Sequence, residues 1–414
     1  MNQGPIVELA QGGFGGVVNG GVNIFRAIPY AKAERFGTPQ APLSHVGVRD
    51  ASRPGVIPPQ LPSRLEIVMG PTYEATQSED CQQISVFTPN LHGKRPVMVW
   101  FHGGANVSGG GELPWYDGTK LAAEQDVVVV TVSHRLGALG YLYMPERGVM
   151  NLGLQDQIAA LRWVKTNVSR FGGDPDAIVA FGQSAGAHSV LAILEHEPNL
   201  VQRAIIQSAP AGIRLTAGQA SEVRQLLEAE LGCGLDQASV ENILKAQEKV
   251  MARSKLPFPF SPVMDDRAIT TDLPVIDLLI GYTRNEAAPF VHLELQKRGL
   301  RTLHVVSRML GTVLGRKVIG RPSADVFANW KAEGRNAFLY RIDWAPRGAS
   351  FGATHCVELP LLLGDQAAWA RAPMLGQEKW DDIDRLGRDF RAAWVNFART
   401  GQRPRENTAL KIVG

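Results

Sequence analysis

A short segment near the middle of the chain places the strongest constraint on the fold. The apolar run 177–181 leads into Gly-Gln-Ser-Ala-Gly at 182–186, and a helix-forming run follows at 189–194. A serine hydroxyl becomes a nucleophile where a sharp turn projects it toward a base, and that turn leaves no room for Cβ atoms on either side. The segment therefore predicts a strand, a tight turn and a helix, with Ser184 as the nucleophile.

Composition describes an ordinary globular protein. The 414 residues are 44% hydrophobic and 20% charged, and 43 basic against 40 acidic residues give a formal net charge of +3. No basic block stands out, so neither nucleic acid nor an anionic membrane surface is an expected partner, and no stable membrane association is predicted.

The cysteines and the N-terminus indicate a compartment. Cys81, Cys233 and Cys356 are odd in number and far apart, which does not make a disulfide framework and suits a reducing environment. The first residues lack a charged start followed by an apolar segment, and no run of about 18 apolar residues occurs. These features predict a cytoplasmic enzyme.

Strands alternate with helices from Pro96 onward. The expected strands are 97–101, 127–132, 177–181, 203–207, 277–281 and 337–342. The expected helices are 154–168, 222–231, 238–249 and 382–400. This alternation predicts a mostly parallel sheet that helices cover on both faces, with sites beyond the carboxyl ends of the strands.

The segments outside this alternation are expected to be hairpins and loops. The glycine-rich stretch 12–21 contains Asn19-Gly20, a hairpin dipeptide, and 37–78 has the composition of surface loops. No internal repeat or low-complexity linker interrupts the chain. We therefore expect one domain over 1–414, with insertions around 40–80 and 212–270 that shape the site.

A serine nucleophile needs main-chain donors for the oxyanion and a base held by an acid. His102-Gly103-Gly104-Ala105 follows the strand 97–101, where small residues let N–H groups approach a ligand. The expected donors are the N–H groups of Gly104, Ala105 and Ala185.

The base should lie downstream of the nucleophile. His292, His304 and His355 qualify by position, and His355 is favoured because it sits in a Gly/Ala/Thr loop after the strand 337–342. His292 and His304 lie in segments that are expected to be helical. His188 lies one helical turn beyond Ser184, where core packing is the expected role.

Two acidic residues could orient the base. Glu286 follows the strand 277–281 after a short loop, and Asp343 follows the strand 337–342 directly. Position along the chain favours Glu286 as the acid, and Asp343 stays an alternative.

Taken together, the chain resembles the type-B carboxylesterases, the branch of the α/β-hydrolase fold that includes the cholinesterases. The segments that carry the resemblance, besides the serine turn and the His-Gly-Gly loop, are Phe25–Ala31, Ser78–Cys81, Arg135–Tyr141, Asn151–Gln157, Phe171–Pro175, Gly281–Glu286, Ala353–His355, Glu358–Pro360 and Trp394–Ala398. They occur in the family's order along nearly the whole chain.

The resemblance implies further roles. It assigns the acid to Glu286 rather than Asp343. It also implies two structural ion pairs, Glu79 with Arg135 and Arg35 with Asp174.

Departures from the family pattern bear on the substrate. Ala105 stands where the family has a third oxyanion glycine, which narrows the space near the alcohol of the ester, and Gln183 replaces a common glutamate. Ile57 stands where the disulfide partner of Cys81 would fall. The chain is also shortened between Leu256 and Asp277 and again before Asn336, which implies a reduced gorge or cap region and a more open site.

The expected activity is that of a serine carboxylesterase acting on esters of short to medium acyl chains through an acyl-enzyme. The expected partner is a small-molecule ester, and neither a metal nor a cofactor is required. The alternatives are a catalytically silent binding module and an amidase or acyltransferase on the same scaffold.

Overall fold

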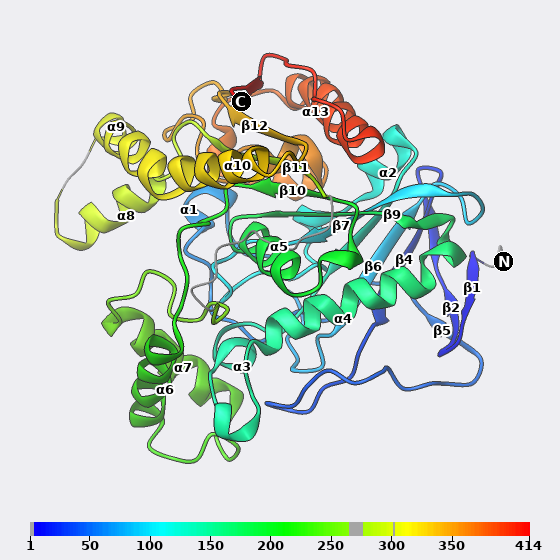
Figure 1. Ribbon diagram of the computed structural model, residues 1–414, viewed down its shortest axis with the longest axis horizontal. Helices are drawn as coiled ribbons and strands as arrows, with labels where there is room; N and C mark the ends of the chain where they lie inside the picture. The colour runs from blue at the N-terminus through cyan, green and yellow to red at the C-terminus, as the bar shows by residue number, and fades with distance from the viewer. Residues whose placement is uncertain (1–3, 265–275, 301–302) are drawn as a thin grey trace.

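A central sheet organises the molecule in the computed structural model, which describes residues 4–264, 276–300 and 303–414 (Figure 1). Within these residues the sheet has ten strands in the order β13-β12-β11-β10-β9-β7-β8-β6-β4-β3. Its strands are β3 (Val17–Asn19), β4 (Val22–Pro29), β6 (Gln83–Thr88), β7 (Arg95–Phe101), β8 (Val128–Val132), β9 (Gly173–Gln183), β10 (Arg203–Gln207), β11 (Asp277–Thr283), β12 (Ala337–Ile342) and β13 (Leu410–Ile412).

The strands from β12 to β8 in this order run parallel, and the strands outside them are antiparallel to their neighbours. The prediction of a mostly parallel sheet is confirmed, and each expected strand is present with its ends moved by a few residues at most. The carboxyl ends of the parallel strands meet at one edge, where the candidate residues lie.

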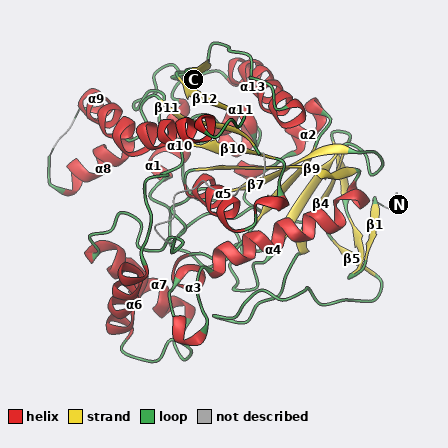
Figure 2. Ribbon diagram, viewed as in Figure 1, coloured by secondary structure: helices red, strands yellow, loops and turns green. Residues whose placement is uncertain are grey.

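Helices cover both faces of the sheet (Figure 2). They include α2 (Thr119–Gln125), α4 (Leu152–Asn167), α5 (Ala185–His196), α10 (Arg321–Ala332) and α13 (Trp380–Thr400). Successive side chains of a strand point to opposite faces. Val99 of β7 therefore packs in one core with Leu161 and Val190 of α4 and α5, and Trp100 packs in the other core with Trp394 of α13.

The fold contains further helices besides these. They are α1 (Glu66–Met69), α3 (Gly137–Tyr141), α6 (Ala217–Leu231), α7 (Val240–Arg253), α8 (Ala288–Lys297), α9 (His304–Gly315), α11 (Leu359–Leu362) and α12 (Gln366–Trp369). Helices α3, α6 and α7 share a separate apolar cluster that includes Leu139, Leu227 and Ile243. None of the helices in the described residues has both the length and the apolar character needed to cross a bilayer.

The N-terminal glycine-rich stretch forms strands, with one difference from the prediction. β1 (Ile6–Leu9), β2 (Gly12–Gly15) and β5 (Val48–Asp50) make a small separate sheet. Asn19 is the last residue of β3, and the turn residues before β4 are Gly20 and Gly21, both with positive φ. A two-residue turn with positive φ at both positions suits glycine best, so the turn lies one residue later than Asn19-Gly20.

The segment 37–78, expected to be loops, also holds β5 and the short helix α1. The three cysteines are free, as expected. Of the two expected shortenings, the one between Leu256 and Asp277 lies largely outside the described residues. The segment before Asn336 contains α8, α9 and α10.

The two ion pairs implied by the resemblance have different partners in the structure. Arg135 pairs with Asp156 of α4 at 2.7 Å, and both side chains are almost fully buried. Arg35 pairs with Glu79, and both side chains are partly exposed. The carboxylate of Asp174 instead accepts the N–H of Asp176 at 2.9 Å. The expected pairs of Glu79 with Arg135 and of Arg35 with Asp174 are therefore wrong.

The reason lies in the packing of α4. Asp156 accepts both the main-chain N–H of Arg135 at 3.1 Å and its guanidinium, so one carboxylate satisfies a buried N–H of the loop after β8 and the buried cation together. Glu79 lies on the loop nearer the surface, where Arg35 reaches it.

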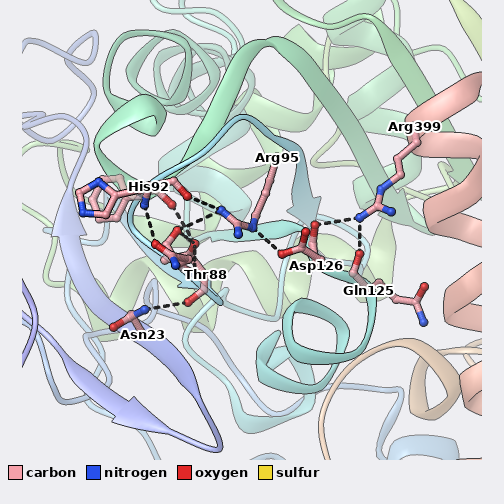
Figure 3. A network of polar contacts seen from close by, with 9 residues as sticks. Asn23, Thr88, His92, Arg95, Gln125, Asp126 and Arg399 are labelled. Atoms are coloured by element: carbon pink, nitrogen blue, oxygen red, sulfur yellow. Dashed lines mark hydrogen bonds and ion pairs between the residues drawn. The ribbon is translucent and has the colours of Figure 1, made fainter.

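A polar network surrounds Arg95 at the amino end of β7 (Figure 3). The guanidinium of Arg95 donates to the carboxylate of Asp126 at 2.5 Å and to the carbonyl of His92 at 2.6 Å. Arg399, at the end of α13, donates to the carbonyl of Asp126 at 2.9 Å and to that of Gln125. The network ties α13 to the loops at the amino ends of the strands, away from the edge that holds Ser184.

Candidate active site

Ser184 occupies the turn between β9 and α5. Its backbone has φ 57° and ψ −120°, a combination that residues with a side chain rarely adopt. Its N–H donates to the carbonyl of Gln207 at 2.8 Å, which ties the turn to β10. A Cβ on Gly182 would lie 2.7 Å from the carbonyl carbon of Gly186, and one on Gly186 would lie 2.0 Å from the carbonyl oxygen of Phe101. Both flanking positions therefore require glycine, as the turn geometry predicts.

His355 and Glu286 form a buried pair at the ends of neighbouring strands. Nδ1 of His355 lies 2.6 Å from Oε2 of Glu286, and the two side chains are 2% and 1% exposed. The other carboxylate oxygen accepts the N–H of Thr283 at 2.7 Å and the hydroxyl of Ser208. These contacts fix the orientation of the carboxylate and, through it, of the imidazole.

The loops that carry this pair are also joined to each other. The N–H of Asn285 donates to the carbonyl of Ala353 at 2.8 Å, and the N–H of Ala353 donates to Oδ1 of Asn285 at 2.9 Å. Two residues separated by 68 positions in the chain thus hold the loop after β11 against the loop after β12.

Asp343, the alternative acid, is engaged elsewhere. Its carboxylate accepts from Nε of Arg341 at 2.6 Å and lies 3.2 Å from Nζ of Lys411. The hydrogen bond from Arg341 lowers the pKa of Asp343 below its ordinary value. The structure brings Glu286 to His355 and keeps Asp343 in ion pairs with Arg341 and Lys411.

The second ring nitrogen of His355 faces the serine turn. Its Nε2 lies 3.0 Å from the side-chain amide nitrogen of Gln183, the residue before Ser184. Because Nδ1 faces a carboxylate, Nδ1 carries the proton and Nε2 accepts from the amide. Among the described residues no hydrogen bond joins the side chains of Ser184 and His355, so Gln183 holds the nitrogen that points toward the turn.

The surroundings of the His355 imidazole shift its pKa. Burial by itself lowers the pKa of His355, but the charge of Glu286 and its hydrogen bond to the ring outweigh burial. The net effect raises the pKa of His355 above its ordinary value. The protonated ring is therefore the form that Glu286 stabilises.

The glycine loop after β7 lies against the serine turn. A Cβ on Gly103 would lie 3.2 Å from Cβ of Ser184. Gly104 has φ 117° and Ala105 has φ 56°, so the loop turns sharply at both residues. The N–H groups of Gly104, Ala105 and Ala185 have no hydrogen-bond acceptor within residues 4–264, 276–300 and 303–414. These three N–H groups are free to receive an anion.

The other histidines that were considered have structural environments. Burial lowers the pKa of His188 to about 4, which keeps this buried residue of α5 neutral. Nδ1 of His292 lies 3.1 Å from the hydroxyl of Ser307, and the ring stacks on that of His304 at 4.6 Å. Of the four histidines, His355 is the one bonded to Glu286.

Sequence reasoning assigned no role to Ser208 or Glu358, although Glu358 begins one of the segments that carry the resemblance. Ser208 follows β10 directly, so its only signal was a hydroxyl at the carboxyl end of a central strand. Glu358 is buried three residues after His355, and burial, with a smaller contribution from the charge of Glu286, raises its pKa to about 7. Its Oε1 accepts from the side-chain amide of Gln207 at 3.4 Å.

A small cavity adjoins the glycine loop. Gly103 and Gly104 form part of its wall, and the apolar part comes from Leu65, Met69 and Trp115, among others. Leu65 and Met69, from the segment 40–80, thus line space next to the glycine loop.

A serine on a tight strand-to-helix turn, followed along the chain by an acid and then a histidine beyond parallel strands, defines the α/β-hydrolase fold. The sequence and the structure are also similar to known proteins of this fold class, and these similarities identify the family. The model of the Carboxylesterase family matches residues 3–305. The chain belongs to this family.

Individual relatives cover nearly the whole chain. The sequence is 37% identical to a probable N-octanoylanthranilate hydrolase of Rhodococcus erythropolis, over 96% of this chain and 93% of that protein. It is 34% identical to the para-nitrobenzyl esterase of Bacillus subtilis (strain 168), over 96% and 90%. A solved structure of a PNB esterase superposes with a TM-score of 0.81 at 29% identity, over 98% of this chain and 93% of that one. The prediction of a carboxylic ester hydrolase with the α/β-hydrolase fold is confirmed.

Proposed function

We propose that Ser184, His355 and Glu286 form the catalytic triad of this esterase. The observation that carries the proposal is the 2.6 Å contact of the buried His355–Glu286 pair, with the other ring nitrogen turned toward the Ser184 turn. In this arrangement Nε2 takes the proton of Ser184 as its oxygen attacks the ester carbonyl. Gln183 has to release Nε2 for that transfer, because one lone pair accepts one proton.

The remaining steps follow from the same geometry. The tetrahedral oxyanion is held by the N–H groups of Gly104, Ala105 and Ala185, each worth on the order of 3 kcal/mol to the transition state. His355 then protonates the departing alcohol, which leaves an acyl group on Ser184. Water attacks the acyl-enzyme with His355 again as base, and the acid is released.

The substrate that we propose is a small ester of a short to medium acyl chain. The apolar cavity beside Gly104 supports an apolar substituent on one side of the carbonyl. The names of two relatives, a para-nitrobenzyl esterase and an N-octanoylanthranilate hydrolase, support an aromatic group and an acyl chain. The methyl of Ala105 next to the free N–H groups argues against esters of tertiary alcohols.

The test is a serine substitution combined with a covalent probe. Ser184→Ala should lower ester turnover by about a thousandfold or more and abolish labelling by a fluorophosphonate. Ser254→Ala, at the end of α7, is the control and should keep both. Wild-type turnover or labelling in Ser184→Ala would refute the triad.

A second candidate activity is amide hydrolysis. The relative at 37% identity is named for an N-acyl substrate, and the same triad cleaves amides when it can protonate the nitrogen. Comparing p-nitrophenyl butyrate with the matching anilide separates the two. A silent binding module is disfavoured because all three proposed triad residues are present.

We also propose that residues 1–414 work as one catalytic domain in the cytoplasm. The insertion around 40–80 supplies walls of the cavity, and Gln247, in the insertion around 212–270, accepts the N–H of Ala138 at 2.8 Å. Three free cysteines support a reducing compartment.

A further inference from the structure

Helix α9 exposes large apolar side chains along its outer side. We call Leu303, Val306, Met309, Leu310, Val313 and Leu314 the α9 face. All six are exposed, with Leu303 and Val313 at 72% and Met309 at 68%. Single exposed apolar residues are normal on protein surfaces, but a continuous group of this size marks an interaction site.

The orientation of α9 is fixed from the inside. Its buried positions are the small residues Ser307, Gly311 and Gly315, spaced by four. A Cβ on Gly311 would lie 2.3 Å from Cα of Ala288, and one on Gly315 would lie 2.5 Å from Cβ of Glu286. The glycines let the helix pack closely on the loop that holds Glu286. Because a larger side chain does not fit there, the helix cannot rotate to bury its apolar residues.

The charges around the α9 face have one sign. From Arg298 to Ala324 the sequence contains no Asp or Glu. Arg316, Lys317 and Arg321 are exposed and form no ion pair with a described residue. Arg316 and Lys317 directly follow the last residue of α9, so their charges lie at the end of the apolar helix, and no described carboxylate neutralises them. Figure 1 shows α8 and α9 at the periphery of the molecule, away from the central sheet.

We propose that the α9 face docks on an anionic lipid surface. An apolar helix side flanked by Arg and Lys lies at the boundary between headgroups and acyl chains, where apolar burial and attraction to anionic lipids act together. A second copy of the chain is the less suitable occupant. Pairing two α9 faces about a twofold axis brings their unpaired basic residues toward each other, and like charges oppose such contact.

This inference does not depend on the proposed catalytic roles. It revises the expectation from composition, which gave no sign of an anionic membrane partner because basic residues are spread along the chain. The fold places several of them around one apolar surface. The cytoplasmic leaflet carries anionic lipids, so the docking agrees with the proposed compartment.

Sedimentation of the full-length protein with lipid vesicles tests the proposal. The wild type should bind phosphatidylglycerol-containing vesicles about tenfold more than pure phosphatidylcholine vesicles, and added salt should weaken the binding. Met309→Gln with Val313→Gln should lower binding about tenfold, and so should Arg316→Gln with Lys317→Gln. The control is Leu43→Gln with Val46→Gln, two exposed apolar residues of a distant loop, which should bind like the wild type.

Two results would overturn the proposal. One is equal binding of the wild type to both kinds of vesicle, or to neither. The other is a dimer in light scattering that Met309→Gln with Val313→Gln dissociates, because a second copy would then cover the face. Melting curves and ester turnover of each variant show that it is folded, so a loss of binding reports on the surface.

Discussion

The side-chain amide of Gln183 lies 3.0 Å from Nε2 of His355, on the ring nitrogen opposite the contact with Glu286. The imidazole is thus held at both nitrogens, by a carboxylate on one side and by a neutral amide on the other. The neutral partner satisfies Nε2 without adding a second negative charge that would favour the protonated ring.

Gln183→Glu should therefore shift the pH profile. A carboxylate beside Nε2 favours the imidazolium and raises the pKa of His355, and the protonated ring cannot accept the proton of Ser184. The acidic limb of kcat/KM should move upward by about one pH unit, so activity is lost at a higher pH during acidification. Gln183→Ala removes the hydrogen bond without adding charge and should show no upward shift. Identical profiles for the two variants would contradict this role of charge.

Glu286→Gln should lower kcat by about ten-thousandfold, because an amide cannot stabilise the imidazolium or keep the correct tautomer. The matched control is Asp343→Asn, the alternative acid of the sequence, which should keep kcat. Steady-state kinetics on p-nitrophenyl butyrate measure both. A comparable loss of kcat in Asp343→Asn would show that the acid has been misassigned.

The two ion pairs should differ in their contribution to stability. Asp156→Asn leaves the guanidinium of Arg135 buried without a countercharge and should lower the free energy of unfolding by about 3–5 kcal/mol. Glu79→Gln opens the partly exposed pair with Arg35 and should cost about 1 kcal/mol or less. Urea unfolding measures both variants. Equal losses of unfolding free energy in the two variants would contradict the expectation that the buried pair contributes more to stability than the exposed one.

Glu358 should make stability depend on pH. Its pKa in the fold is about 7 against 4.5 for an ordinary glutamate, so between these values the folded chain binds more protons than the unfolded chain. The protonated carboxyl of Glu358 stabilises the fold fully below the unfolded pKa of 4.5, and this stabilisation is lost as the pH rises through the folded pKa of about 7. The loss is on the order of 3 kcal/mol.

Glu358→Gln should remove this decline, and Glu74→Gln, at an exposed position, should retain it. Unfolding free energies measured across this pH range give the comparison. A decline of equal size in wild type and Glu358→Gln would show that another group is responsible.

Much of the fold could be read from local pattern. Runs such as 203–207 and 337–342 are apolar and of strand length, and the structure has strands with those same ends. The serine turn was recognisable because it has no room for a Cβ atom at Gly182 or Gly186, and this requirement shows directly in the local sequence. His355 followed from its position in a loop after a strand, and the resemblance was needed to choose Glu286 over Asp343.

The partners of side chains were less predictable. The pairing of Arg135 with Asp156 depends on how α4 lies across the ends of the strands, and nothing in the spacing of charges along the chain encodes that. Ser208 was missed for the same reason, since a serine after a strand carries no signal until the neighbouring loop brings a carboxylate to it.

The sequence by itself determined the order of strands and helices, the serine turn and the family, because these depend on periodicity, local sterics and short motifs. Only the tertiary structure decided which charges pair, that Gln183 holds His355, and that α9 turns its large apolar residues outward. Those outcomes depend on contacts between segments far apart in the chain. A helix such as α9 has the same apolar pattern whether it is buried or exposed, and the close packing of its glycines against the loop of Glu286 selects the exposed arrangement.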